Sequence, residues 1–218
     1  MKAMILAAGR GERLRPLTER IPKPLIPIGS EPLIVHQLRW LHRAGIREVV
    51  INLHHLGGEI ERALGAGSDL GVRIRYSVEE RLLDTGGGIK NALPILGDEP
   101  FVLLNGDIWT SYRFANLVGL RPRLAHLVLT PTPPEKTRAD FHMAGGRVHR
   151  GAADDLTYCG IAVISKALFA HSPDGPFSLT QPLFKAAANG DLEGEVFDGA
   201  WIDIGTPDQL KRVRRLTL

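Results

Sequence analysis

A glycine-rich loop near the start of the chain has the residue types that bind phosphate. Gly9 and Gly11 follow an apolar run, and glycines let backbone N–H groups surround an anion closely. Arg13 adds a guanidinium that forms charge-assisted hydrogen bonds with phosphate oxygens. The chain lacks the Gly-Lys-Ser/Thr of a Walker loop, Leu14 replaces the third glycine of a dinucleotide loop, and Pro16 opposes the helix that would follow. The pattern predicts a phosphate site of another kind, with an ordinary turn as the alternative.

A single lysine stands between two prolines a few residues later. Pro22 and Pro24 flank Lys23 and should hold this segment stiff and extended. A lysine held in this way provides a positive point charge for a phosphate group. The alternative is an exposed lysine in a linker.

Two aspartates follow apolar runs in different parts of the chain. Asp107 ends the run Phe101–Asp107, and Asp203 lies in the apolar segment Gly199–Ile204. Ligands of α/β sheets bind at the carboxyl ends of the strands, so we expect both carboxylates at that edge, although Asp107 also fits an ordinary turn. A carboxylate in apolar surroundings is costly unless it is paired or binds a metal. The two aspartates therefore predict one Mg²⁺ site.

A run of glycines provides a candidate surface for a flat base. The segment Asp84–Ile89 contains three consecutive glycines at a predicted helix start, and Thr85 there can offer a hydrogen bond. The alternative is a flexible loop that leads into a helix.

Alternating strands and helices must position these residues. Apolar runs rich in β-branched residues predict strands at Ala3–Ala7, Val49–Leu53, Arg73–Ser77, Phe101–Asn105, His126–Thr130, Gly160–Ser165 and Gly199–Asp203. Helical spacing predicts helices at Pro32–Ala44, Gly58–Leu64 and Gly87–Leu93, and a further helix capped by Thr206 and Gln209. This alternation predicts an α/β fold with a Rossmann-like, mostly parallel (mixed) sheet flanked by helices.

We expect residues 1–218 to form a single domain. The proline- and glycine-rich stretch near 131–156 predicts a loop and hairpin excursion on the substrate side, before the chain returns to the sheet. No hexapeptide repeat follows residue 203, so we expect no C-terminal β-helix.

Composition narrows the class of protein. The net charge is +3, from 27 basic and 24 acidic residues, and this small excess gives no reason to expect nucleic acid as a partner. No apolar stretch approaches the length of a membrane span. The single cysteine, Cys159, excludes an internal disulfide and favours a reducing cytoplasm. The oligomeric state is left open by these features.

Taken together, the motifs resemble the sugar-1-phosphate nucleotidyltransferase family. The ordered segments are Leu6–Pro16, Pro22–Leu25, Thr85–Gly86, Asn105–Asp107 and Trp201–Thr206, and they span nearly the whole chain. Within the family the chain looks most like the short bacterial N-acetylmuramate 1-phosphate uridylyltransferases of cell-wall peptidoglycan recycling. The features are Thr85–Ile89, Asn105–Thr110, Ala125–Leu129 and Asp140–Phe141.

This resemblance implies a role for each candidate residue. The nucleotide would be bound by Ala8, Gly9, Gly11, Glu12, Arg13 and Lys23, with Thr85 and Gly86 at the base. The sugar or its phosphate would contact Asn105 and Asp140. Asp107 and Asp203 would hold Mg²⁺, and Arg13, Lys23 and Asp107 would be the catalytic residues.

The implied reaction transfers UMP from UTP to N-acetylmuramate 1-phosphate and releases pyrophosphate. A mannose- or glucose-1-phosphate nucleotidyltransferase is one alternative, because these enzymes share the same core motifs. A non-catalytic sugar-nucleotide sensor on the same fold is another, but Lys23, Asp107 and Asp203 are all retained, which opposes it. A dinucleotide-dependent enzyme is opposed by Leu14 and Pro16.

Overall fold

A nine-stranded sheet is the main feature of the computed structural model, which describes residues 1–134, 136, 139–151 and 156–216. The strands are β1 (Ala3–Leu6), β2 (Pro27–Ile28), β3 (Glu31–Pro32), β4 (Glu48–Leu53), β5 (Arg73–Val78), β6 (Phe101–Asn105), β7 (Ile108–Thr110), β8 (Ala125–Pro131), β9 (Phe141–Ala144), β10 (Arg147–Arg150), β11 (Leu156–Ile164), β12 (Leu192–Val196) and β13 (Trp201–Asp203). The α-helices are α1 (Leu33–Arg43), α2 (Gly57–Leu64), α3 (Asp84–Leu96), α4 (Thr180–Ala188) and α5 (Pro207–Leu216). Short 3-10 helices are η1 (Glu12–Leu14), η2 (Leu17–Glu19), η3 (Lys23–Leu25), η4 (Ser68–Leu70), η5 (Phe114–Leu117) and η6 (Lys166–Phe169).

The sheet is mixed, as predicted. Its strand order is β5-β4-β1-β6-β11-β8-β12-β10-β9, and the first four of these strands pair in parallel. Beyond β6 the pairing changes, because β11 runs antiparallel to both β6 and β8. The parallel half contains the strands that alternate with helices in the sequence, so its carboxyl ends share one edge.

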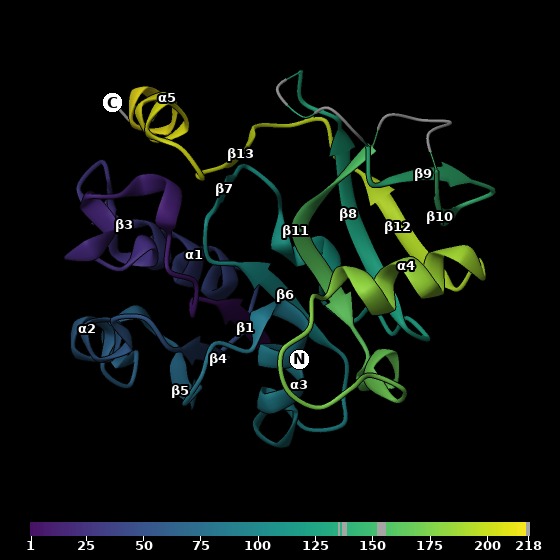
Figure 1. Cartoon of the computed structure of the whole chain (residues 1–218), viewed down its shortest axis with the longest axis horizontal. Coiled ribbons are helices and arrows are strands. Elements are labelled where there is room, and N and C mark those ends of the chain that lie inside the picture. Colours follow the sequence, from purple (N-terminus) through teal and green to yellow (C-terminus); the bar gives the residue numbers. More distant parts are fainter. Residues whose placement is uncertain (135, 137–138, 152–155, 217–218) are drawn as a thin grey trace.

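Helices cover both faces of the sheet (Figure 1). On one face, Leu38 of α1 and Ile60 of α2 pack into a core cluster with residues of β1, β4 and β6. On the other face, Ile89 of α3 and Leu183 of α4 pack into a second cluster. This burial on both faces explains why the central strands are apolar throughout.

A third cluster lies beside the carboxyl end of the parallel strands. Leu14 and Ile26, from the segment that follows β1, pack against Ile202 of β13 and Leu210 of α5. This packing holds the glycine-rich loop against the C-terminal part of the described chain. The start of α5 has the predicted capping box, because Gln209 N donates to Thr206 Oγ1 (3.4 Å) and Thr206 N donates to Gln209 Oε1 (2.9 Å).

The hairpin predicted near 131–156 is part of the main sheet, whereas we expected an excursion outside it. β9 and β10 do form a hairpin, but β10 pairs with β12 and β9 pairs with β11 at Leu156, so the hairpin extends the sheet instead of standing apart from it. Residues 135, 137–138 and 152–155 of this stretch lie outside the described residues. The assignment of the whole chain to one domain stays a prediction.

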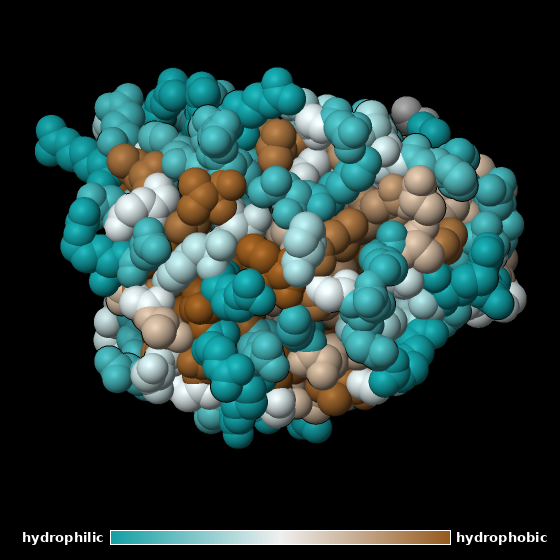
Figure 2. Space-filling model, turned by 90° about the horizontal axis from the view of Figure 1, so that it is seen from below, coloured by the Kyte–Doolittle hydropathy of each residue, from teal (hydrophilic) through white to brown (hydrophobic). Residues whose placement is uncertain are grey.

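One face of the surface shows how polar and apolar side chains are distributed. In the view of Figure 2, hydrophilic side chains cover most of the face, and visible hydrophobic ones gather mainly across its middle. Within the described part of the chain, no helix has the length and apolar character needed to cross a membrane. In that part of the chain, α5 is the only element after β13.

Candidate active site

The glycine-rich loop leaves the carboxyl end of β1 and turns back sharply at Gly11. Gly11 has the left-handed conformation (φ 63°, ψ 34°), and its carbonyl oxygen accepts a 2.8 Å hydrogen bond from Thr18 Oγ1. A Cβ at this position would lie 2.8 Å from Thr18 Cγ2. Gly9 has open space around it. Gly11 therefore has the backbone shape that the sequence predicts for an anion-binding loop, whereas Gly9 leaves open space beside that loop.

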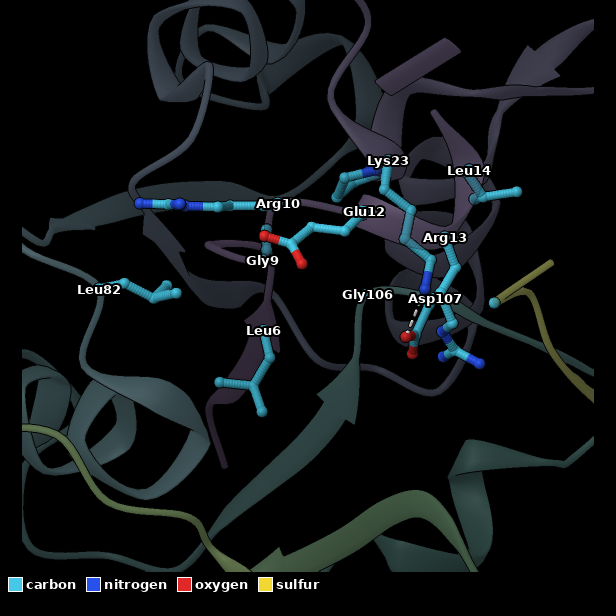
Figure 3. A pocket seen from close by; sticks show the side chains of 14 residues that line it. Leu6, Gly9, Arg10, Glu12, Arg13, Leu14, Lys23, Leu82, Gly106 and Asp107 are labelled. Carbon is cyan, nitrogen blue, oxygen red and sulfur yellow. Dashed lines mark hydrogen bonds and ion pairs between the residues drawn. The ribbon is translucent and has the colours of Figure 1, made fainter. Parts of the chain in front are cut away.

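Two adjoining cavities form a cleft along the carboxyl ends of β1 and β6. The first, of about 470 Å³, is shown in Figure 3, and the second has about 370 Å³. They share Leu6, Gly9, Leu82, Gly106 and Asp107. The predicted site residues in the first are Gly9, Gly11, Glu12, Arg13, Lys23 and Asp107, and those in the second are Ala8, Gly9, Thr85, Asn105 and Asp107. Most of the predicted site residues thus line one cleft.

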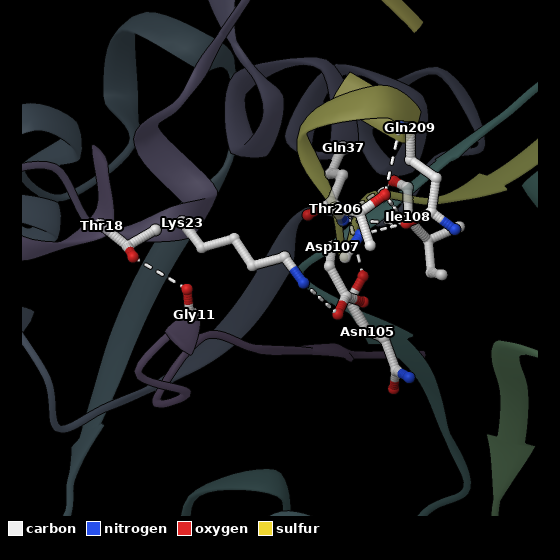
Figure 4. A network of polar contacts seen from close by, with 10 residues as sticks. Gly11, Thr18, Lys23, Gln37, Asn105, Asp107, Ile108, Thr206 and Gln209 are labelled. Carbon is white, nitrogen blue, oxygen red and sulfur yellow. Dashed lines mark hydrogen bonds and ion pairs between the residues drawn. The ribbon is translucent and has the colours of Figure 1, made fainter. Parts of the chain in front are cut away.

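Lys23 forms an ion pair within this cleft. Its Nζ donates to Asp107 Oδ2 at 2.7 Å, and the side chains of Lys23 and Asp107 are only 13% and 28% exposed (Figures 3 and 4). The expected extended backbone is found at Pro22, but Lys23 itself begins the 3-10 helix η3. The flanking prolines therefore position the lysine through a tight turn, and the ammonium is in the site instead of in a linker.

A buried glutamine fixes the turn that carries Asp107. Gln37 of α1 donates through Nε2 to the carbonyl oxygens of Asn105 (3.0 Å) and Ile108 (2.9 Å), as Figure 4 shows. A Cβ at Gly106 would lie 2.3 Å from the carbonyl oxygen of Leu6, so only glycine allows this close approach of the turn to β1. Asp107 consequently has a fixed position relative to the glycine-rich loop.

Asp203 reaches the same place from a second, small sheet. β13 pairs antiparallel with β7, with Asp203 opposite Ile108, and Ile204 N donates to the carbonyl oxygen of Asp107 at 2.9 Å. The structure therefore brings the two aspartates together. The prediction that Asp203 ends a strand is correct, but that strand belongs to the two-stranded β7–β13 ribbon and not to the main sheet.

The Asp203 carboxylate lacks a protein partner for one of its oxygens. Its Oδ1 is buried and makes no hydrogen bond in the structure. Burial, and after it the charge of Asp107, raises the pKa of Asp203 to about 6, whereas Lys23 and Arg13 act in the opposite direction. A buried oxygen without a partner, next to a second carboxylate, suits a hard divalent cation. In the described part of the chain no three His, Cys, Asp or Glu side chains converge on one point, so such a cation would complete its shell with water or substrate oxygens.

Arg13 lies against a glycine that sequence reasoning did not single out. A Cβ at Gly205 would lie 2.5 Å from Arg13 Nη2, so the missing side chain leaves room for the guanidinium. The backbone N of Gly205 donates a 2.9 Å hydrogen bond to Gln209 Oε1, which holds this glycine in place. In the sequence, the position of Gly205 two residues after Asp203 was the feature that could have indicated its role.

The three glycines at the start of α3 pack against protein. Gly86 N and Gly87 N donate to the carbonyl oxygen of Phe177 (2.9 and 3.1 Å), and a Cβ at Gly86 would lie 2.3 Å from the Phe177 ring. Gly86 and Gly87 make room for the segment around Phe177, and Gly88 makes room for other side chains of the protein. Protein atoms therefore lie where a glycine surface for a base was expected. Thr85 does line the second cavity, and its Oγ1 accepts from Leu179 N at 2.8 Å. The assignment of Thr85 and Gly86 to the base stays a prediction.

Of the two residues predicted to contact the sugar, Asn105 ends β6 and Asp140 directly precedes β9. The side chain of Asn105 fits over Gly160 (φ 71°), where a Cβ would be 2.7 Å from Asn105 Nδ2. Asn105 Oδ1 is buried without a partner. Asp140 Oδ2 accepts from Lys136 Nζ (2.6 Å) and from Tyr158 N (3.1 Å), so it joins the start of the hairpin to β11. The assignment of Asp140 to the sugar stays a prediction.

Comparisons with known proteins agree with this geometry. A family model described as nucleotidyl transferase matches residues 2–139. An N-acetylmuramate alpha-1-phosphate uridylyltransferase of Neisseria meningitidis is 39% identical over 99% of this chain and 98% of its own length. A protein of the same name from Caulobacter vibrioides is 35% identical over 94% of this chain and 92% of its own.

Two further proteins are similar to this chain at lower sequence identity. The mannose-1-phosphate guanylyltransferase catalytic subunit beta of Danio rerio is 31% identical over 95% of this chain, which spans 62% of that protein. A Bacillus anthracis protein solved in complex with sucrose superposes with a TM-score of 0.88 at 23% identity, over 100% of this chain and 95% of that one.

Proposed function

Since the chain belongs to the nucleotidyl transferase family and is a sugar-1-phosphate nucleotidyltransferase, we propose that it transfers UMP from UTP to N-acetylmuramate 1-phosphate and releases pyrophosphate. The choice of substrates is supported by two relatives of that name that match nearly their whole length. Such an enzyme would serve the recycling of cell-wall sugars. The alternative pair, GTP and mannose 1-phosphate, is supported by a relative that is 31% identical and extends well beyond this chain.

The observation that supports catalysis is the convergence of charges at the loop after β1. In the proposed reaction an oxygen of the sugar 1-phosphate attacks the α-phosphorus of UTP, and the bond from that phosphorus to the oxygen of the β-phosphate breaks, which releases pyrophosphate. A phosphate monoester dianion is already a nucleophile, so the site needs no general base. The protein must position two polyanions and balance their charge.

We assign this balancing of charge to Arg13 and Lys23. Arg13, with Gly205 leaving room beside it, offers a planar donor group to the phosphates, and Lys23 offers a point charge at the loop. The N–H groups around Gly9 and Gly11 add neutral donors. These groups are in place before substrate binds, and preorganised donors stabilise a charged transition state best.

Asp107 and Asp203 are the residues that would hold Mg²⁺. When bound, Mg²⁺ neutralises charge on the phosphate that undergoes transfer. The unpartnered Oδ1 of Asp203 and the neighbouring carboxylate of Asp107 support this assignment. We expect EDTA to abolish turnover and added Mg²⁺ to restore it. Full turnover in EDTA would remove the metal from the mechanism and leave the reaction class in place.

A pyrophosphate-release screen tests the proposed pair of substrates. UTP, dTTP, GTP, CTP and ATP are each combined with N-acetylmuramate, N-acetylglucosamine, glucose and mannose 1-phosphates. We expect UTP with N-acetylmuramate 1-phosphate to have the highest kcat/KM. A clear preference for GTP with mannose 1-phosphate would refute the pair.

A further inference from the structure

A chain of hydrogen bonds between buried side chains joins the phosphate loop to the wall beneath the second cavity. Ala7 N, just after β1, donates to Asn52 Oδ1 at 2.8 Å. Asn52 Nδ2, at the end of β4, donates to Glu79 Oε1 at 2.7 Å. Glu79 Oε2 in turn accepts from Leu83 N at 3.0 Å, one residue before α3 begins. Asn52 and Glu79 are only 2% and 4% exposed, so water does not replace these bonds.

The direction of the hydrogen bonds explains why one member is a carboxylate. Both ends of the chain are backbone N–H groups, at Ala7 and Leu83, and these can only donate. Asn52 uses its oxygen for Ala7 and its NH₂ for the next residue. That next residue must then accept at two atoms, which a carboxylate does and a carboxamide does not. In the described part of the chain Glu79 has no ion pair, so these hydrogen bonds are its compensation for burial.

The glycine beside these two side chains is matched to them. A Cβ at Gly88 would lie 2.6 Å from Glu79 Oε1 and 2.8 Å from Asn52 Nδ2. Gly88 lies inside α3, where alanine would form a helix better. Glycine is needed there because a side chain would occupy the space of the Glu79 carboxylate.

The hydrogen-bonded chain lies where the walls of the nucleotide cleft meet. Asn52 itself lines the second cavity, together with Ala8 from the loop and with Leu82 and Thr85 from the other wall. A fixed distance between Ala7 and Leu83 therefore fixes the spacing of these walls.

We propose that Asn52 and Glu79 are positioning residues for the nucleotide: they set the spacing between the phosphate loop and the wall that carries Leu82 and Thr85. This inference rests on the proposed function. It assigns to the pair a role in binding the nucleoside triphosphate and none in binding the sugar phosphate.

Single isosteric substitutions should change the KM for UTP and leave the KM for the sugar 1-phosphate unchanged. Glu79→Gln leaves two donors facing each other at one end of the chain, and Asn52→Asp places two buried carboxylates together. We expect each to raise the KM for UTP, and the Kd of UTP measured by calorimetry, about tenfold to hundredfold. The KM for the sugar 1-phosphate should stay within about twofold. Asn91→Asp, an asparagine of α3 that donates to Ser77 outside the cleft, is the matched control and should change neither constant.

The double variant Asn52→Asp/Glu79→Gln restores the complementarity with its direction reversed. The carboxylate introduced at position 52 would accept from Ala7 N and from the amide introduced at position 79, whose own oxygen accepts from Leu83 N. We expect the double variant to recover at least tenfold of the lost UTP affinity. If a single variant does not fold, recovery of folding and of UTP binding in the double variant is the expected result. A double variant no better than the single ones, or single variants with unchanged UTP constants, would overturn the inference.

The same experiment separates this inference from the choice of substrate. All constants are measured with the nucleotide that the wild-type protein uses best. A preference for another nucleotide refutes the proposed pair alone, whereas unchanged nucleotide constants in the variants refute the positioning role alone.

Discussion

Replacing Asp203 by asparagine should stabilise the metal-free protein at neutral pH and at the same time inactivate the enzyme. The carboxylate is buried, its Oδ1 has no partner, and Asp107 repels it, so the charge destabilises the fold when no cation is bound. Asparagine keeps the shape and removes the charge. Activity should fall at least about a hundredfold, because a proposed metal ligand is lost.

The size and the pH dependence of this stabilisation follow from the pKa of Asp203. Burial and the neighbouring Asp107 raise this pKa from 3.8 to about 6. Each pKa unit corresponds to about 1.4 kcal/mol, so the charged carboxylate destabilises the fold by at most about 3 kcal/mol above pH 6. The folded pKa is the higher one, so the stability from the protonated carboxyl is complete below pH 3.8 and is lost as the pH rises through 6. The amide needs partners of its own, and we therefore expect a gain of about 1–3 kcal/mol at pH 8.

Asp107→Asn is the matched control, because it should have the opposite effect on stability. Asp107 accepts the hydrogen bond from Lys23, whose side chain is only 13% exposed. Asparagine can still accept from Lys23, but it removes the negative charge beside a largely buried ammonium, and a charge-assisted bond is worth about 1.5–3 kcal/mol. The loss of activity should match that of Asp203→Asn. The loss of activity in the double variant should be much smaller than the product of the two single losses, because both residues are proposed to act through one ion.

Urea denaturation in EDTA at several pH values, from 4.5 to 8, measures the free energy of unfolding of the three proteins. The difference between Asp203→Asn and wild type should grow between pH 4.5 and about 6 and stay constant above it. A destabilised Asp203→Asn at pH 8, or a gain in stability that is the same at pH 4.5 and 8, would refute this account.

Three further substitutions test other parts of the site. Lys23→Ala should lower kcat/KM about tenfold to hundredfold through the loss of charge-assisted contacts with phosphate, and unchanged steady-state turnover would remove Lys23 from the mechanism. Asp140→Ala should raise the KM for the sugar 1-phosphate and leave that for UTP nearly unchanged, and the reverse pattern in initial-rate kinetics would refute its assignment to the sugar. Gly205→Ala would place a Cβ 2.5 Å from Arg13 Nη2, so we expect a loss of kcat of about tenfold or more, whereas wild-type kcat would show that Arg13 can move without cost.

The sequence was most informative where local chemistry and chain direction act together. The apolar run before Asp107 predicts a buried parallel strand, and the aspartate at its end must then lie at the ligand-binding edge. Gly11 needs the left-handed backbone that a phosphate loop also needs. In both cases a short segment already indicates the result, and distant contacts such as those of Gln37 with the Asp107 turn then fix the position.

Other elements were missed because distant contacts decide them. β12 contains Glu193, Gly194 and Glu195, a polar strand that forms because β8 and β10 lie on either side of it. α4 begins at Thr180 and has only moderate amphipathic character, and its packing against β10 and β12 compensates. The glycines of α3 suggested a surface for a ligand, yet Gly86 and Gly87 pack against the segment around Phe177, far away in the sequence, and Gly88 lies beside Glu79.

Glu79 and Asp203 are both buried carboxylates, but the protein compensates their charges to different extents. In the sequence, Glu79 stands in a charged run with Glu80 and Arg81 that is typical of a solvated surface, whereas Asp203 stands in an apolar segment. The structure buries both, but it satisfies both oxygens of Glu79 with N–H groups and leaves Oδ1 of Asp203 without a partner. A buried charge that the protein compensates completely stabilises its own surroundings. A buried charge left partly uncompensated costs stability, and a cation that brings phosphate into the site would remove that cost.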